Sequence, residues 1–235
     1  MNCWICGASG AATREHRTKA SDLKDLFGSA SQQDPLYLHT SARPGAPARR
    51  NVRIGSLKAD ALKYNHRICL RCNSAVTQPY DYAWEYASAE LRPAVPRLLE
   101  RGSFRANWLY PYDTRRGMLD VHLYFVKLFG CQIVEGGIPI DPAPFSRAIL
   151  DRRPHPKVFL AFGHLETAAM VVAGGSDVHT LVRNDGVVAF AVWLYQVGGL
   201  CVRIMYAEPG EENREGLALA WHPKRGAKRI PFSLF

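Results

Sequence analysis

Residues 67–81 of the chain, RICLRCNSAVTQPYD, contain two cysteines, Cys69 and Cys72. Such a Cys-x-x-Cys pair alone allows three interpretations, since it can bind a metal, undergo redox chemistry or fill a core. A second pair near the start of the chain, Cys3 and Cys6 in CWICG, favours the first interpretation. Together the pairs supply four thiolates, which suit a closed, tetrahedral structural zinc site. We therefore expect Zn²⁺ to join the N-terminal segment to the stretch quoted above.

The other two interpretations have less support. No strand–helix–strand pattern surrounds either pair, whereas such a pattern accompanies the redox motif of thioredoxin-like proteins. The two remaining cysteines, Cys131 and Cys201, lie in apolar surroundings, in LFGCQIV and GGLCVRIM. Free cysteines in such surroundings are typical of a hydrophobic core. Paired cysteines without a secretory signal indicate a reducing setting, so we expect a cytoplasmic protein.

Polar side chains flank both cysteine pairs. Glu15 and His16 follow the first pair, and Asn73 comes directly after the second. If zinc holds the two pairs together, these three side chains can converge on one point. A carboxylate and an amide oxygen suit a hard divalent cation such as Mg²⁺, and an imidazole can take a proton from an attacking water. The set is therefore suited to hydrolysing a phosphodiester bond.

The combination CWICG…REH…RICLRCNS…YD resembles the zinc-bearing HNH endonucleases, which have a ββα-metal fold. It is most similar to the branch with the pattern C-x-x-C-G…E-H…C-x-x-C-N…D. The resemblance covers about residues 1 to 90. Its motif is fairly specific, because two cysteine pairs, an acidic-His dipeptide and an asparagine directly after the last cysteine occur together.

The resemblance implies a role for each matching residue. His16 would be the general base, and Glu15 would bind the catalytic metal, Mg²⁺ or Mn²⁺. Asn73 stands where many members have a histidine, and it would be the second metal ligand. Asp81 matches the later aspartate of this branch, either as a third ligand or simply as the first-turn acid of a helix that begins near Pro79.

The sequence departs from the family pattern in two places. About fifty residues separate His16 from Cys69, more than the compact motif needs, and among them Asn65 approximates the middle asparagine that orients the base. The usual histidine is absent after Cys72, and an amide oxygen is a weaker ligand than imidazole. The extra length includes SARPGAPARRN, residues 41–51, which we expect to be a flexible basic loop.

The charge distribution favours a polyanionic partner. The chain has a net charge of +9 and a pI of about 9.4, and proteins this basic commonly bind nucleic acid. Between residues 41 and 72, Asp60 is the only acid among many basic side chains. The residues expected to contact nucleic acid are Arg43, Arg49, Arg50, Arg53, Lys58, Arg67 and Arg71. A solvated basic surface is the alternative.

The expected secondary structure divides the chain into residues 1–102, an HNH-like module with a basic insertion, and residues 103–235, an α+β segment of unassigned role. In the first, we expect a strand end at 14–16, a helical turn at 21–27 capped by Ser21, a helix at 56–64, and a helix from Pro79 that Pro93 and Pro96 interrupt. In the second, we expect helices at 118–130, with Gly130 as a stop signal, and at 141–153. Strands are expected after them, at 157–165, 167–175, 177–184, 186–197, 199–207 and 215–223. The expected fold class is α+β, with a mostly antiparallel sheet.

Two functional hypotheses follow. The first is an endonuclease that depends on a divalent metal and hydrolyses phosphodiester bonds, in DNA more than in RNA. The second is a zinc-stapled nucleic-acid-binding protein without catalysis, which would use the same cysteines and the same basic residues. The sequence contains no run of 18 apolar residues, so we expect no membrane span. A protein partner bound through residues 103–235 is a further expectation, which rests only on the size of that segment.

Overall fold

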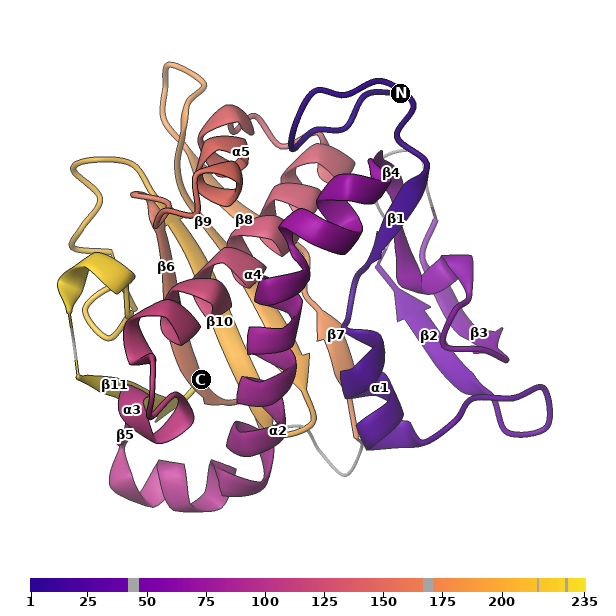
Figure 1. Cartoon of the computed structure of the whole chain (residues 1–235), viewed down its shortest axis with the longest axis horizontal. Coiled ribbons are helices and arrows are strands. Elements are labelled where there is room, and N and C mark those ends of the chain that lie inside the picture. The colour runs from indigo at the N-terminus through magenta and orange to yellow at the C-terminus, as the bar shows by residue number, and fades with distance from the viewer. Residues whose placement is uncertain (42–46, 167–170, 215, 227) are drawn as a thin grey trace.

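The computed structural model describes residues 1–41, 47–166, 171–214, 216–226 and 228–235 of a mixed α+β fold. In Figure 1, two long helices, α2 and α4, lie across one face of the main sheet. The α-helices are α1 (Ala20–Phe27), α2 (Gln78–Arg101), α3 (Ala106–Leu109), α4 (Thr114–Gly136) and α5 (Ala143–Leu150). Shorter helical turns are η1 (Asp60–Leu62), η2 (Cys72–Val76) and η3 (Pro223–Arg225).

The main sheet follows the order β5-β11-β6-β10-β9-β7, and β8 also pairs with β9. Its strands are β5 (Ser103–Arg105), β6 (Val158–His164), β7 (Ala173–Gly175), β8 (His179–Val182), β9 (Val188–Val197), β10 (Leu200–Ala207) and β11 (Arg229–Leu234). All these pairings are antiparallel except that of β11 with β6, so the predicted antiparallel sheet is confirmed. Two small antiparallel pairs lie apart from it: β1 (Thr13–His16) with β4 (Lys63–Ile68), and β2 (Leu36–Thr40) with β3 (Arg49–Ile54).

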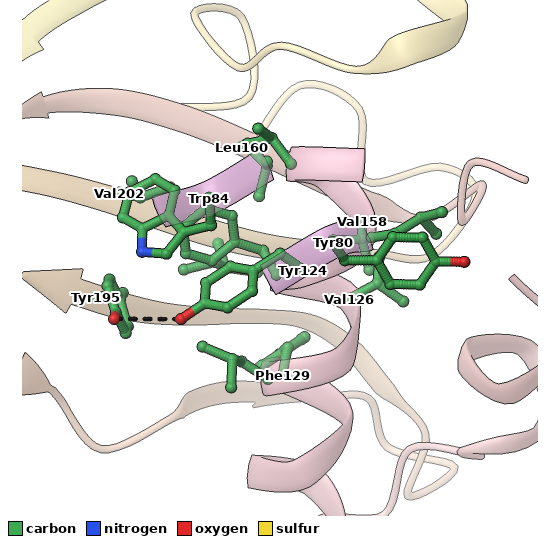
Figure 2. Packing of buried hydrophobic residues seen from close by; sticks show 14 of the residues in the cluster. Tyr80, Trp84, Tyr124, Val126, Phe129, Val158, Leu160, Tyr195 and Val202 are labelled. Atoms are coloured by element: carbon green, nitrogen blue, oxygen red, sulfur yellow. Dashed lines mark hydrogen bonds between the residues drawn. The ribbon is translucent and has the colours of Figure 1, made fainter. Parts of the chain in front are cut away.

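An aromatic cluster forms the centre of the core. Trp84 of α2 stacks on Tyr124 of α4 and meets Tyr195 of β9 edge to face, with ring centroids 5.6 Å and 5.7 Å away. Figure 2 shows the three rings and the hydrogen bond, 3.3 Å long, between the two tyrosine hydroxyls. The apolar core extends on both sides of residue 102. The domain boundary at that position stays a prediction.

Helix α4 is the central helix of the fold. By length and composition it is apolar enough to cross a membrane, but 83% of its apolar window is buried inside the protein. A helix that is apolar on all sides is what a buried position requires. The two unpaired cysteines, Cys131 in this helix and Cys201 in β10, are buried as expected.

Helix α2 contradicts the expectation that Pro93 and Pro96 interrupt it, because it continues through both residues to Arg101. A proline inside a helix removes one backbone hydrogen bond each time. Here both prolines are exposed, so water can solvate the carbonyls that lose a partner. The opposite face buries Leu91 and Leu98 in the core, and this burial outweighs the lost hydrogen bonds.

Gly130 does not end helix α4, which continues to Gly136 and stops at Gly137 in the left-handed conformation. A Cβ atom at Gly130 would lie 2.3 Å from the Trp4 ring. The glycine therefore serves close packing between the helix and the N-terminal segment, and not helix termination.

Three other local predictions were wrong. Ser21 lies inside α1 and makes no capping hydrogen bond, since the N-cap is Lys19. Residues 56–64 contain only the short turn η1 before β4 begins at Lys63, so they do not form a helix. The basic loop expected at 41–51 is partly strand, because β3 begins at Arg49.

The C-terminal part of the chain differs from expectation at its end. Residues 216–223 form turns and one isolated bridge, Leu160 to Trp221, instead of a strand. Strands β5 and β11 were missed, because β5 has three residues and β11 contains Pro231. Arg43 and residues 167–170 lie outside the described residues.

Candidate metal and active site

The four cysteines of the two pairs come together as expected. The sulfur atoms of Cys3, Cys6, Cys69 and Cys72 all lie within 4.8 Å of one another. Tetrahedral zinc, with Zn–S bonds of about 2.3 Å, places its sulfurs about 3.8 Å apart, and the Cys6 and Cys69 sulfurs are separated by 3.5 Å. In the described parts of the chain, this is the only group of three or more His, Cys, Asp or Glu side chains that could hold a metal ion.

Local backbone geometry places these thiols. The first pair lies in a turn in which the Gly7 N–H donates to the Cys3 carbonyl at 2.8 Å. Gly7 has φ +75°, a conformation that favours glycine. In the second pair, the backbone N–H of Cys72 donates to the Cys69 sulfur at 3.4 Å and lowers the pKa of that thiol to about 7. A thiol with this pKa readily gives the thiolate that a metal binds.

The hairpin between the two cysteine pairs is irregular where Glu15 lies. β1 pairs Arg14 with Arg67 and His16 with Lys63, so β1 advances two residues while β4 advances four. In the bulged part of β4, the backbone N–H groups of Asn65 and His66 instead donate to the Glu135 carboxylate of α4, each at 3.0 Å. Such bulges redirect neighbouring side chains.

Glu135 therefore ties the hairpin to helix α4. Burial alone would raise the pKa of this carboxyl, but the two backbone N–H groups and Arg17 outweigh it and lower the pKa. Arg17 also approaches the carboxylate at 2.7 Å. The side-chain amide of Asn65 donates to the same carboxylate at 2.8 Å. Asn65 is thus engaged with α4 and not with the histidine that it was expected to orient.

The Glu15 carboxylate lies against a buried lysine. Its Oε2 accepts from Nζ of Lys127 at 2.9 Å, and Oδ1 of Asp81 accepts from the same ammonium at 2.6 Å. The Lys127 side chain has no exposed surface. Burial alone would lower the pKa of Lys127, but the two carboxylates outweigh it and raise the pKa, so the lysine is charged. The ammonium group of Lys127 thus lies between Glu15 and Asp81, the two carboxylates that were predicted to bind a metal ion.

Asp81 occupies the first turn of α2, in agreement with the alternative of a first-turn helix acid. Besides Lys127, its Oδ1 lies 3.5 Å from Nζ of Lys19. Lys19 also pairs with Glu85 at 3.1 Å. Two lysines therefore neutralise Asp81.

His16 faces a different neighbour from Glu15. Its Nε2 lies 3.2 Å from the carbonyl oxygen of Leu57, so Nε2 carries the proton that is donated to it. Burial lowers the pKa of His16, which keeps the ring neutral near pH 7. The other nitrogen, Nδ1, has no hydrogen-bond partner among the described residues and is not closed off from solvent. A neutral ring with one anchored and one open nitrogen is able to accept a proton.

Two other predicted residues also present open atoms. Oε1 of Glu15 and the side-chain amide of Asn73 have no hydrogen-bond partner among the described residues; Glu15 is 6% exposed and Asn73 is half-buried. Asn73 lies in η2, which packs against β1. Asn73, directly after the last cysteine of the cluster, thus lies beside the strand that carries Glu15 and His16.

No family model, curated protein or solved structure matches this chain. The likeness to HNH endonucleases therefore depends on the motif and on the local arrangement around it. That arrangement is two antiparallel strands, a cysteine cluster and a following helix, α2.

The predicted nucleic-acid contacts lie on β3, on β4 and in the segments next to η1 and η2. All of the described ones are exposed: Arg49, Arg50 and Arg53 on β3, Lys58 before η1, Arg67 on β4 and Arg71 beside the cysteine cluster. The guanidinium of Arg53 donates to the carbonyl of Gln32. The carbonyl of Leu57, which anchors His16, lies next to Lys58 in the chain.

The sequence analysis missed two residues of α4 that contact the site, Lys127 beside Glu15 and Glu135 beside Asn65. Lys127 and Glu135 belong to α4, more than a hundred residues after Glu15 in the chain. A lysine within the apolar run MLDVHLYFVKLFG is the signal that could have revealed the first of them, since a buried lysine needs a carboxylate partner.

Proposed function

We propose that the protein is a zinc-stapled endonuclease of the HNH type, which hydrolyses phosphodiester bonds with a divalent cation and prefers DNA to RNA. One observation carries the proposal: Glu15 and His16 on β1 and Asn73 on η2 lie on neighbouring elements beside the cysteine cluster, and each has a side-chain atom without a hydrogen-bond partner among the described residues. In this proposal the four thiolates hold structural zinc, with no open coordination position.

His16 is the general base of the proposed reaction. Its Nδ1 takes a proton from the attacking water, while the Nε2–H bond to the Leu57 carbonyl fixes the tautomer and the ring orientation. The lowered pKa keeps His16 unprotonated at neutral pH, which is the form that a base requires.

Glu15 and Asn73 are the proposed ligands of Mg²⁺ or Mn²⁺. Oxygen ligands of this kind suit both ions, and when bound the cation polarises the phosphate and stabilises the leaving oxygen. Lys127 holds Oε2 of Glu15 at 2.9 Å and leaves Oε1 open for that ligation. Asp81 is assigned to Lys127 and Lys19, to which it is already paired.

The exposed arginines of β3 and β4 are the proposed contacts to the phosphate backbone. Contacts of this kind position a duplex and make binding strongly dependent on salt, without reading the base sequence. Arg67 lies on β4, which pairs with β1, the strand of His16, so a nucleic-acid strand bound along β4 passes the proposed base.

Nicking of supercoiled plasmid tests the proposal. The zinc-loaded protein should nick the plasmid with Mg²⁺ or Mn²⁺, and His16→Ala should lower the rate by about 10²- to 10⁴-fold, the usual contribution of a general base. His39→Ala is the matched control, because His39 is exposed on β2. A structured RNA assayed in parallel tests the preference for DNA. Equal nicking by wild type and His16→Ala would contradict the assignment.

A second candidate function is nucleic-acid binding without catalysis. It is favoured by Lys127, whose ammonium already neutralises both Glu15 and Asp81. This candidate predicts binding that weakens with salt, needs no divalent cation and leaves the plasmid intact. Binding of plasmid without nicking in either metal would establish it in place of the nuclease.

A further inference from the structure

Four arginines line a pocket at the end of helix α2, on the side of the fold away from the cysteine cluster. The pocket has a volume of about 520 Å³, within the usual range for small-molecule sites. Arg97 and Arg101 come from α2, Arg105 from β5 and Arg229 from β11. In Figure 1, α2, α3, β5 and β11 meet at this end of the molecule.

The four arginines are arranged as two pairs of like charge. Arg105 and Arg229 lie directly opposite each other in the antiparallel pairing of β5 with β11, and Arg97 and Arg101 are four residues apart on one helix. Both arrangements are destabilising without a counter-charge. No described carboxylate forms a salt bridge with any of the four. The helix dipole stabilises the positive charge of Arg101, which lies in the last turn of α2, but it does not account for the other three arginines.

The wall of the pocket is aromatic. Trp108 is 36% exposed and meets the buried ring of Phe104 edge to face, at 6.4 Å between centroids. The guanidinium of Arg97 lies 5.5 Å from the centre of the Trp108 ring. An exposed tryptophan beside several guanidinium groups offers a stacking surface for a flat ring and donors for an anion.

We propose that this pocket binds a phosphate-bearing nucleotide, with the base stacked on Trp108 and the phosphates held by Arg105, Arg229 and Arg101. Guanidinium groups match phosphate oxygens in pairs, and a bound phosphate removes the repulsion between Arg105 and Arg229. Two sources share this chemistry, a free nucleotide and the 5′-phosphorylated end of a nucleic-acid strand.

The pocket is separate from the proposed nuclease site. Asn73 precedes α2, and the pocket lies at the other end of this helix of 24 residues, which is roughly 36 Å long at 1.5 Å per residue. Binding in the pocket needs no divalent cation and no His16. His16→Ala should therefore bind the same ligands as wild type, and a failure of the nuclease proposal leaves this one standing.

Titration of the zinc-loaded protein with ADP, without added divalent cation, tests the pocket by calorimetry. Replacing Arg105 and Arg229 together by Ala should weaken ADP binding by at least about tenfold, since a charge-assisted hydrogen bond contributes that much. The matched control replaces the exposed Arg147 and Arg153 by Ala, which lowers the net charge equally, and neither of them lines this pocket. Its affinity should stay within about twofold of wild type.

Trp108→Ala separates stacking from charge. It should weaken ADP binding by roughly tenfold, because a stacked base contributes about that much, and leave pyrophosphate binding nearly unchanged. An equal loss for both probes contradicts the stacked base.

An oligonucleotide of eight nucleotides, with and without a 5′-phosphate, identifies the source of the nucleotide. Tighter binding of the phosphorylated form identifies a strand end, and binding of ADP alone identifies a free nucleotide; either result supports the pocket. The proposal is wrong if ADP does not bind and the two oligonucleotides bind equally. It is also wrong if the pocket variant and its control lose affinity to the same extent.

Discussion

Lys127 is the main difference between the site that the motif predicts and the site in the structure. The motif places Glu15, Asn73 and Asp81 together as oxygen ligands, and the fold adds an ammonium between two of them, 2.9 Å from Glu15 and 2.6 Å from Asp81. A buried cation of this kind is retained only where both carboxylates compensate its loss of hydration. We infer that Lys127 is a positioning residue that fixes Glu15.

Lys127→Met should lower the free energy of unfolding by about 3–5 kcal/mol, because it leaves the largely buried Glu15 carboxylate without a partner and Asp81 with Lys19 alone, at 3.5 Å. Urea unfolding followed by circular dichroism measures this loss. Adding Asp81→Asn and Glu15→Gln to Lys127→Met should recover most of it, since the triple variant has no unpaired buried charge. A Lys127→Met protein as stable as wild type would show that the three groups do not depend on one another.

At the scale of elements, the cysteine cluster joins the N-terminal segment to the stretch that leads from β4 into α2. The first pair precedes β1, and the second lies at the start of η2. Between them, β2 and β3 are mostly exposed, so little apolar burial supports this pair of strands, whereas β4 buries Tyr64 and Ile68 in the core. A metal ion that binds only the folded arrangement adds its binding free energy to stability.

The purified protein should contain one zinc ion per chain, and Cys72→Ser should lose it. Cys201→Ser is the matched control, because Cys201 is also buried but lies in β10, away from the cluster. Zinc content follows from elemental analysis, and the melting temperature should fall more for Cys72→Ser than for Cys201→Ser. Retention of zinc by Cys72→Ser would contradict the four-thiolate site.

Gly130 provides a second test of how the N-terminal segment is held. Gly130→Ala should lower the free energy of unfolding by about 1–3 kcal/mol, because the new methyl group displaces the Trp4 ring that lies 2.3 Å from its position. Gly136→Ala in the same helix is the control, since its nearest contact is Ile138 at 3.3 Å. Equal stability of the two variants in urea unfolding would show that Trp4 repacks freely.

At the scale of the whole molecule, periodicity and turn residues predicted much of the fold, and long-range contacts explain what they missed. The strands β6, β9 and β10 and the hairpin turn at Gly198 were predictable, because their apolar residues and turn signals are local. Gly130 and the two prolines of α2 were misjudged, since their effect depends on Trp4 and on burial against the sheet. The cysteine cluster was predictable because its cysteines repeat one motif, whereas Lys127 contributes through a contact that no local pattern contains.

Three histidines from distant parts of the chain form a further buried group. His122 of α4 accepts from the backbone N–H of His155 at 3.1 Å, and Nε2 of His222 lies 2.9 Å from the His155 carbonyl oxygen. The rings of His122 and His222 are 5.3 Å apart. Nδ1 of His122 and Nε2 of His155 are buried with no partner in the described structure. Burial lowers the pKa of all three, for His155 to about 3.

These histidines should make the protein less stable as the pH falls below 6.5. In the unfolded chain each has an ordinary pKa near 6.5, so between pH 6.5 and about 3 the unfolded state binds protons that the folded state does not. For each histidine the free energy of unfolding should fall by up to about 1.4 kcal/mol per pH unit below pH 6.5, until the pH reaches the folded-state pKa of that residue, which is about 3 for His155. Above pH 7 the group has no such effect.

Urea unfolding between pH 5 and 7.5, where most carboxyl groups stay ionised, measures this slope. His122→Asn removes one member of the group and should reduce the slope by about 1.4 kcal/mol per pH unit, whatever its effect on stability at pH 7.5. His39→Gln is the control, because His39 is exposed on β2 and its loss should leave the slope unchanged. If both variants keep the slope of wild type, the acid sensitivity arises outside this group, and the three histidines are a packing feature without influence on pH dependence.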